Sequence, residues 1–138
     1  MLAGQNAGAD AIIIQDMAIL EMARKGINGL HEGLRIPLHA STQCAIRTPE
    51  QAMFLESLGF SRLIIERELS LEQIRAIRSA VSCELEFFVH GALCVCYSGQ
   101  CYLSEKIAGR SANRGACIQA CRSRYDLVDA AGKIIVRD

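Results

Sequence analysis

The stretch RLIIERELSLEQI, residues 62–74, combines a strand with the start of a helix. Its apolar run, Leu63 to Ile65, is short and continuous, which is typical of a strand buried on both faces. Ser70 and Gln73 then fit a capping box, in which the two side chains bind the free backbone N–H groups at a helix start. The stretch therefore predicts one strand–helix unit.

Similar apolar runs lie on both sides of this unit. Residues 11–15, 36–40 and 83–89 predict three further strands. Pro37 is compatible with a strand only at its beginning, because proline has no N–H to donate to a neighbouring strand. The chain is thus expected to hold four strands over its first ninety residues.

Helix signals separate these strands. Asp16 is a candidate cap after the first strand, and Thr48 with Gln51 forms a second capping box. The helix that Thr48 begins is expected to bury an apolar stripe made of Met53, Phe54 and Leu58.

Alternating strands and helices predict an α/β fold with parallel strands and right-handed crossovers. The architectures to choose between are an open doubly wound sheet and part of a (β/α)8 TIM barrel. No G-x-G-x-x-G motif follows any strand, which argues against dinucleotide binding. Polar residues gather where the strands end, and in barrels that rim carries the chemistry.

A complete barrel needs about 250 residues. Residues 1–90 are therefore interpreted as about four βα units, half of a barrel. Such a half has two exposed sheet edges. We expect the chain to be a fragment of a longer protein, or to pair with another copy through these edges as a homo-oligomer.

Composition limits the cellular setting. The formal net charge is zero, and no run approaches the ~18 apolar residues of a membrane helix. The N-terminus lacks a cationic region before its apolar run, so it does not resemble a secretory signal. These features predict a cytoplasmic protein without membrane association, in a compartment where thiols stay reduced.

The pattern changes after residue 90. Residues 91–124 are rich in cysteine, arginine, glycine and serine and show no sustained periodicity, which predicts a loop segment. Residues 125–138 have two short apolar runs around the Ala131-Gly132 turn, which predicts the start of a C-terminal hairpin.

Five of the seven cysteines fall in the loop segment: Cys94, Cys96, Cys101, Cys117 and Cys121. Clustered cysteines in a reducing compartment favour metal binding or redox chemistry over disulfides. The spacing is wider than the paired knuckles of a zinc finger, and an iron–sulfur cluster tolerates it better. The alternative is that these are small buried hydrophobic residues, which is the interpretation adopted for the isolated Cys44 and Cys83.

Two histidines and a basic run are further candidates. His90 closes the fourth strand and His39 lies in the second, and each is either functional or a structural histidine. Arg110, Arg114, Arg122 and Arg124 lie in a run without an acidic residue. They either contact phosphate, or they solvate the loop or pair with Glu66, Glu68 and Glu86. No Ser/His/Asp set or G-x-S-x-G motif supports hydrolysis.

Several motifs, in order, carry a resemblance to a known family. They are HASTQ at 39–43, ERELSLEQI at 66–74, ELEFFVHGALCVCYSGQCYLS at 84–104 and GRSANRGACIQACR at 109–122. Together they resemble the peptidase U32 family. Residues 90–122 are most similar to the branch that hydroxylates a ribosomal-RNA cytidine.

The resemblance implies more than the residues do alone. Members of the family are described as peptidases of unknown catalytic type, some as collagenases, but several bacterial members are needed to hydroxylate RNA or ubiquinone, and one draws on prephenate. The implied fold is a (β/α)8 barrel with a cysteine-bound [4Fe-4S] cluster. Cys94, Cys101 and Cys117 match cluster ligands, Cys121 matches a ligand of some relatives, and Cys96 stands where relatives often have serine or alanine.

The resulting hypothesis is an iron–sulfur-dependent RNA hydroxylation enzyme. His39 and His90 would line the catalytic rim, the four arginines would contact RNA, and a prephenate-like small molecule is a second candidate partner. The alternatives are a U32 peptidase (collagenase-like protease) and an inactive fragment with a structural metal site, for which zinc is the alternative ion.

Overall fold

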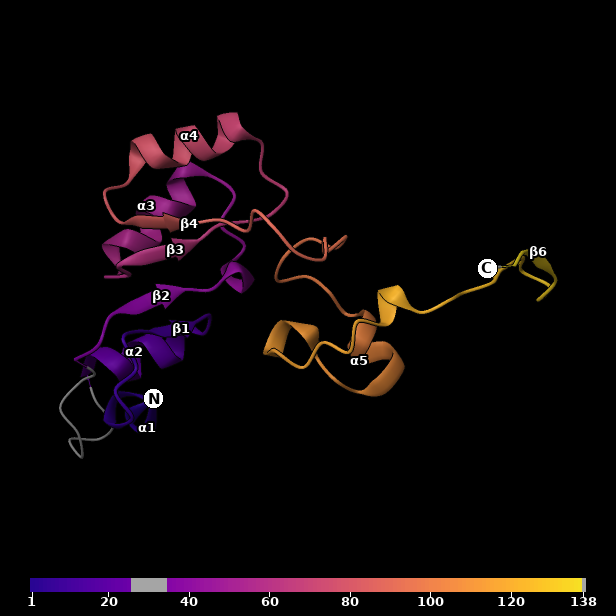
Figure 1. Ribbon diagram of the computed structural model, residues 1–138, viewed down its shortest axis with the longest axis horizontal. Coiled ribbons are helices and arrows are strands. Elements are labelled where there is room, and N and C mark those ends of the chain that lie inside the picture. Colours follow the sequence, from indigo (N-terminus) through magenta and orange to yellow (C-terminus); the bar gives the residue numbers. More distant parts are fainter. Residues whose placement is uncertain (26–34, 138) are drawn as a thin grey trace. The chain divides into compact units, whose positions relative to one another are not determined.

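The computed structural model of the chain describes residues 1–25 and 35–137. It contains two compact units, Met1–Gln100 and Cys101–Asp138 (Figure 1). The sequence interpretation places a boundary at residue 90, whereas the first unit reaches Gln100. The reason is that residues 97–99 bind side chains and backbone at the strand ends of that unit.

The first unit alternates strands and helices. Its four strands are parallel and adjacent in the order β1-β2-β3-β4, which confirms the predicted α/β class and parallel sheet. Its elements are α1 (Leu2–Asn6), β1 (Ile12–Ile14), α2 (Met17–Lys25), β2 (Leu38–Ala40), the 3-10 helix η1 (Thr42–Cys44), α3 (Pro49–Ser57), β3 (Arg62–Ile64), α4 (Leu71–Ala80) and β4 (Glu84–Glu86).

Both predicted capping boxes are present. The Thr48 hydroxyl accepts from the Gln51 backbone N–H at 3.3 Å, and the Gln51 carboxamide oxygen accepts from the Thr48 N–H at 3.2 Å. Ser70 and Gln73 make the same reciprocal pair at the start of α4. Each helix start is thereby defined by its local sequence.

The apolar core lies between one face of the sheet and helices α2, α3 and α4. The strands contribute Ile14, Ala40 and Leu63, and Ile65 follows β3 directly. The helices contribute Leu20, Ala52, Leu55 and Ile77. The expected stripe on α3 is therefore wrong at two positions, because Met53 and Phe54 are exposed. The small side chain of Ala52, fully buried, faces the core in their place.

The other face of the sheet is polar. The strand register aligns Ile13, His39, Arg62 and Glu84 in one row across it. Arg62 donates to Glu84 at 2.8 Å through Nε and to Glu86 at 3.2 Å through Nη1. Ile13 is 57% exposed. Parallel sheets are normally covered on both faces. The described residues cover this face only in part. We call it the open face.

The second unit contains little regular structure. Its elements are α5 (Leu103–Ala108), two 3-10 helices, η2 (Ala112–Arg114) and η3 (Ala120–Arg122), and an antiparallel pair, β5 (Leu127–Val128) and β6 (Ile134–Val136). The pair is the expected hairpin, with Gly132 at a φ of 82°. Helix α5 was not expected, because Tyr102 at its N-cap provides no side-chain capping bond. None of the helices in the described parts of the chain has the length and hydrophobicity needed to cross a bilayer.

Candidate functional site

A buried carboxyl group lies at the carboxyl end of β3. Glu66 is fully buried, and neither of its oxygens has a hydrogen-bond partner within 3.5 Å among the described residues. Burial raises the pKa of Glu66, while the nearby Ser98 hydroxyl acts in the opposite direction. Buried polar groups are nearly always partnered in native proteins, so this exception marks a candidate site.

Ser98 connects the loop after β4 to the strand ends. It is 3% exposed, and its N–H donates to Glu68 Oε1 at 3.0 Å. Its hydroxyl accepts from Arg67 Nη2 at 3.0 Å and its carbonyl from Arg47 Nη2 at 3.1 Å. These bonds hold Ser98 against the carboxyl end of the sheet. We call Ser98, Glu68, Arg67 and Arg47 the Ser98 network.

The neighbouring glycine allows this close approach. A Cβ atom on Gly99 would lie 2.7 Å from the Gln43 carbonyl oxygen, and Gly99 has a φ of 74°. Only glycine fits both conditions without strain. Near it, Gln43 Oε1 and the Nε atoms of Arg47 and Arg67 are buried without a hydrogen-bond partner in the described part of the chain.

The second carboxylate of the site behaves differently from Glu66. Partial burial acts to raise the pKa of Glu68, but the Ser98 N–H bond and the charges of Arg47 and Arg67 outweigh it, so the pKa is lowered. Arg47 lies 3.7 Å from Glu68 Oε1 and also stacks over the Tyr97 ring at 5.0 Å. The two carboxyl groups are thus pushed toward different protonation states, a pattern typical of acid–base sites.

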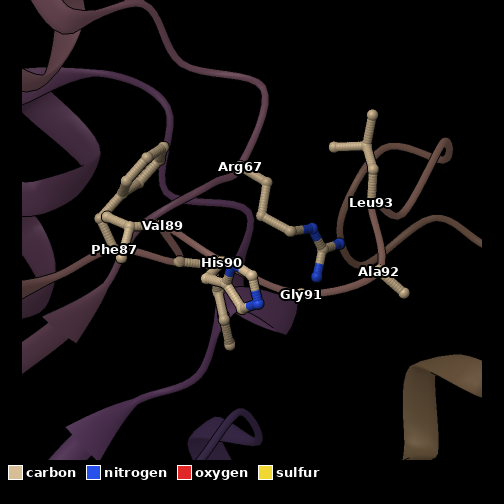
Figure 2. A pocket seen from close by; sticks show the side chains of 8 residues that line it. Arg67, Phe87, Val89, His90, Gly91, Ala92 and Leu93 are labelled. Atoms are coloured by element: carbon tan, nitrogen blue, oxygen red, sulfur yellow. The ribbon is translucent and has the colours of Figure 1, made fainter.

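A pocket of about 450 Å³ opens beside this network. Figure 2 shows Arg67 reaching from the end of β3 toward the segment that carries His90. The Arg67 guanidinium lies 5.9 Å from the centre of the Phe88 ring. The lining residues are Arg67, Phe87, Phe88, Val89, His90, Gly91, Ala92 and Leu93. The pocket therefore combines a fixed cation and an imidazole with an apolar wall.

The two predicted catalytic histidines line different hollows. His39 is half-buried on the open face, in a hollow of about 570 Å³ that Arg62, Ser61 and Pro37 also line. Partial burial, and then the Arg62 charge, lower the pKa of His39. The structure does not bring His39 into the His90 pocket, and the catalytic role of each stays a prediction.

The predicted metal ligands are divided between the two units. Cys94 belongs to the first unit, and Cys101, Cys117 and Cys121 belong to the second. Within the described residues, no three His, Cys, Asp or Glu side chains are grouped closely enough to hold a metal ion. Cys117 nevertheless has a distinctive setting, since its sulfur accepts from Gln119 N–H at 3.3 Å and from the Ser104 hydroxyl at 3.8 Å.

Hydrogen bonds to sulfur suit a thiolate better than a thiol, which is a weak acceptor. Thiolates bind zinc and iron–sulfur clusters. Cys94, Cys101, Cys117 and Cys121 are thus donors of the type that such groups take, but the described residues do not bring three of them together.

Cys44 and Cys83, interpreted from the sequence as core residues, pack against the core. Burial raises the pKa of Cys44 to about 11 and also raises that of Cys83. Burial therefore favours the protonated thiol over the thiolate at both positions.

The predicted phosphate-binding residues, Arg110, Arg114, Arg122 and Arg124, are all exposed on the second unit. The sequence analysis predicts a polar rim at the strand ends, where Glu66, Arg67 and Glu68 lie, but it does not identify Arg47 and Ser98 as part of it. The Ser98-Gly99 pair in a loop after a strand was the available signal, because such a pair permits close backbone approach.

A parallel strand–helix repeat with a polar cluster at its strand ends, followed by a thiol-bearing segment, defines an α/β protein with its candidate site at the carboxyl edge of the sheet. The sequence pattern of peptidase family U32 matches residues 3–135, and the chain belongs to that family.

Three relatives indicate the range of the family. The chain is 54% identical over 128 residues to the 23S rRNA 5-hydroxycytidine C2501 synthase of Escherichia coli (strain K12), covering 93% of this chain and 18% of the relative. It is 40% identical to the tRNA hydroxylation protein P of the same organism, over 87% of this chain and 25% of the relative. It is 34% identical to a collagenase of Porphyromonas gingivalis (strain ATCC BAA-308 / W83), over 92% of this chain and 31% of the relative. The chain thus spans less than a third of the length of each of these curated relatives.

Proposed function

We propose that this chain belongs to a longer U32 protein that hydroxylates RNA, with a ribosomal-RNA cytidine as the substrate most strongly supported. The observation that carries this proposal is the 54% identity to the E. coli rRNA hydroxycytidine synthase over nearly the whole chain. Similarity to a tRNA hydroxylation protein supports the same class of reaction. RNA as substrate and reduced thiols both fit a cytoplasmic protein.

We further propose that Cys94, Cys101, Cys117 and Cys121 hold a [4Fe-4S] cluster. The two hydrogen bonds to the Cys117 sulfur support this assignment, because donors to thiolate ligands are common in iron–sulfur proteins and adjust their reduction potentials. When bound, the cluster would supply one-electron redox chemistry. Zinc on the same thiolates is the alternative, and it would make the site structural.

The pocket lined by Arg67 and His90 is proposed as the small-molecule site. Its cation, imidazole and apolar wall suit a compact organic anion, such as the prephenate-like molecule that the family resemblance implies. The exposed arginines of the second unit, Arg110, Arg114, Arg122 and Arg124, are proposed to contact RNA phosphates.

The open face supports a barrel. Strands β1 and β4 are the edges of the sheet, and the row of His39, Arg62 and Glu84 would face the interior of a closed (β/α) barrel. Since the relatives are much longer, strands from the same chain are the proposed partners of both edges. A second copy of the chain is the alternative, and the mass of the full-length protein in solution distinguishes the two.

The peptidase alternative has one observation in its favour, the 34% identity to a collagenase. The site geometry supports it poorly. The only buried serine of the first unit's described residues, Ser98, bonds to Arg67 and Glu68 rather than to a histidine. Ser98 therefore does not form a nucleophile–base pair with a histidine among the described residues.

The test is a complementation experiment. Cells lacking the full-length protein would express wild type, Cys117→Ser or Cys96→Ser, and hydroxycytidine in ribosomal RNA would be measured by mass spectrometry of nucleosides. We expect wild type and Cys96→Ser to restore the modification and Cys117→Ser to fail. Restoration by Cys117→Ser would refute the cluster's role. An unmodified result with wild type, together with protein cleavage abolished by one point variant, would establish the peptidase.

A further inference from the structure

Tyr97 is an exposed aromatic residue that the proposed reaction does not use. It lies directly before Ser98 in the loop after β4 and is 63% exposed. The guanidinium of Arg47 lies over its ring, 5.0 Å from the ring centre. A cation in this position is attracted to the electron-rich face of the ring. The ring is therefore held in place although most of the residue is in contact with solvent.

Arg47 is itself held by the Ser98 network. Its Nη2 donates to the Ser98 carbonyl at 3.1 Å and lies 3.7 Å from Glu68 Oε1. Its Nε is buried. A flat ligand that stacks on the free face of the Tyr97 ring therefore has to order neither side chain, which lowers the entropic cost of binding.

The same arrangement occurs a second time in the network. Arg67 donates through Nη2 to the Ser98 hydroxyl at 3.0 Å, and its guanidinium lies 5.9 Å from the centre of the Phe88 ring. Phe88 is 51% exposed and lines the pocket beside the network, whereas Tyr97 is not among the lining residues. The Ser98 network thus supports two exposed rings at the carboxyl edge of the sheet, one in the pocket wall and one outside it.

An exposed ring with a cation on one face suits an unpaired nucleobase on the other. Every base has a flat π-face that can stack on an aromatic side chain, and sites for single-stranded RNA combine such rings with positive charge. Enzymes that modify a base usually take it out of the helical stack and pack it against aromatic or apolar side chains. The guanidinium behind the ring also favours a ligand that carries phosphates over an uncharged protein segment.

We propose that Tyr97, held by Arg47, is a stacking residue that binds an unpaired base of the RNA. The inference rests on the proposed RNA-modifying function and adds a base-binding residue to it. The ligand that it requires is RNA with unpaired bases, because the bases of a duplex are already stacked on one another.

The experiment measures RNA affinity of the full-length protein over a range of salt concentrations. The probes are a fluorescently labelled single-stranded RNA and the same sequence paired in a duplex. We expect Tyr97→Leu to weaken single-strand binding by about tenfold and to leave duplex binding unchanged. The slope of log affinity against log salt should stay at the wild-type value, because the substitution removes no charge. Tyr97→Phe keeps the ring and should stay near wild type.

Phe54→Leu is the matched control. Phe54 lies on α3 in the same unit and is 59% exposed, and within the described residues no arginine lies over its ring. We expect this variant to bind both RNAs as wild type does.

Three results would count against the inference. Wild-type single-strand affinity in Tyr97→Leu, or an equal loss in Phe54→Leu, would overturn the role of Tyr97 and leave the RNA function standing. Equal losses for the two RNAs, with unfolding of Tyr97→Leu at lower urea concentration, would show that the ring is structural and would overturn the role as well. Wild-type protein that binds neither RNA would overturn both the inference and the proposed function.

Discussion

Glu66 is the residue whose environment departs most from that of an ordinary surface carboxylate. Its carboxyl group is fully buried without a hydrogen-bond partner within reach among the described residues. The groups that act on it are Ser98, Glu68 and Arg47. An ionised carboxylate in such a place is unfavourable, so the folded protein favours the protonated form.

This raised pKa predicts a dependence of stability on pH. The contribution of Glu66 is fully present below its ordinary pKa of 4.5 and is lost as the pH rises through the raised value in the folded state. Glu66→Gln removes the ionisation, so we expect its free energy of unfolding to fall less than that of wild type as the pH rises from 4 to 8. Urea unfolding of both proteins between pH 4 and 8 measures the difference. If the free energies of unfolding of the two proteins change with pH in parallel, ionisation of Glu66 does not destabilise the folded protein.

The candidate site could be predicted from the sequence only in part, and Arg47 shows why. Glu66, Arg67 and Glu68 follow a strand directly, so their place at the carboxyl edge is readable from the chain. Arg47 and Ser98 are 51 positions apart and meet only because the loop after β4 turns back onto the sheet. A contact between residues so far apart in the chain leaves no local sequence pattern from which it could be predicted.

At the scale of elements, the four strands and helices α2, α3 and α4 of the first unit were predictable because each carries its own signal, whereas α1 and η1 were not expected. The capping boxes at Thr48 and Ser70 define two helix starts, and the apolar runs define the strands. The face that α3 buries was predicted wrongly, since Ala52 packs inward while Phe54 is exposed. Ala52 contributes little to a hydrophobic sequence pattern because its side chain is small. The same small side chain allows α3 to approach the sheet closely with Ala52 on its buried face. Helix α5 has no such signal and is seen only in the structure.

The N-terminal cap of α3 allows a direct test at this scale. Thr48→Ala removes the hydroxyl that accepts from the Gln51 N–H, so we expect the free energy of unfolding to fall by about 1 kcal/mol. Thr48→Ser keeps the acceptor and should stay near wild type. Chemical denaturation of the three proteins makes the comparison, and equal losses in both variants would show that packing of the threonine methyl group, rather than capping, is responsible.

At the scale of the whole molecule, charge is unevenly distributed although the sequence has no net charge. Residues 1–100 hold 11 Asp and Glu against 8 Lys and Arg, whereas residues 101–138 hold 4 against 7. RNA binding driven by arginine–phosphate contacts weakens with salt in proportion to the number of contacts.

Replacing Arg110, Arg114, Arg122 and Arg124 with glutamine in the full-length protein should therefore weaken RNA binding and flatten its salt dependence. Each arginine that contacts a phosphate of single-stranded RNA contributes about 0.7 to the slope of log affinity against log salt. Arg75→Gln, on the exposed side of α4, is the control. If the four substitutions leave the slope unchanged, these arginines do not contact RNA phosphates.

The proposed RNA chemistry depends on the [4Fe-4S] cluster proposed for Cys94, Cys101, Cys117 and Cys121. Its most direct test is the iron, sulfide and zinc content and the visible spectrum of full-length protein purified without oxygen, as wild type, Cys117→Ser and Cys96→Ser. We predict iron and sulfide in equal amounts with broad visible absorption in wild type and Cys96→Ser, and loss of both in Cys117→Ser. Colourless wild-type protein that contains zinc instead of iron would contradict the claim and identify the cysteines as a structural metal site.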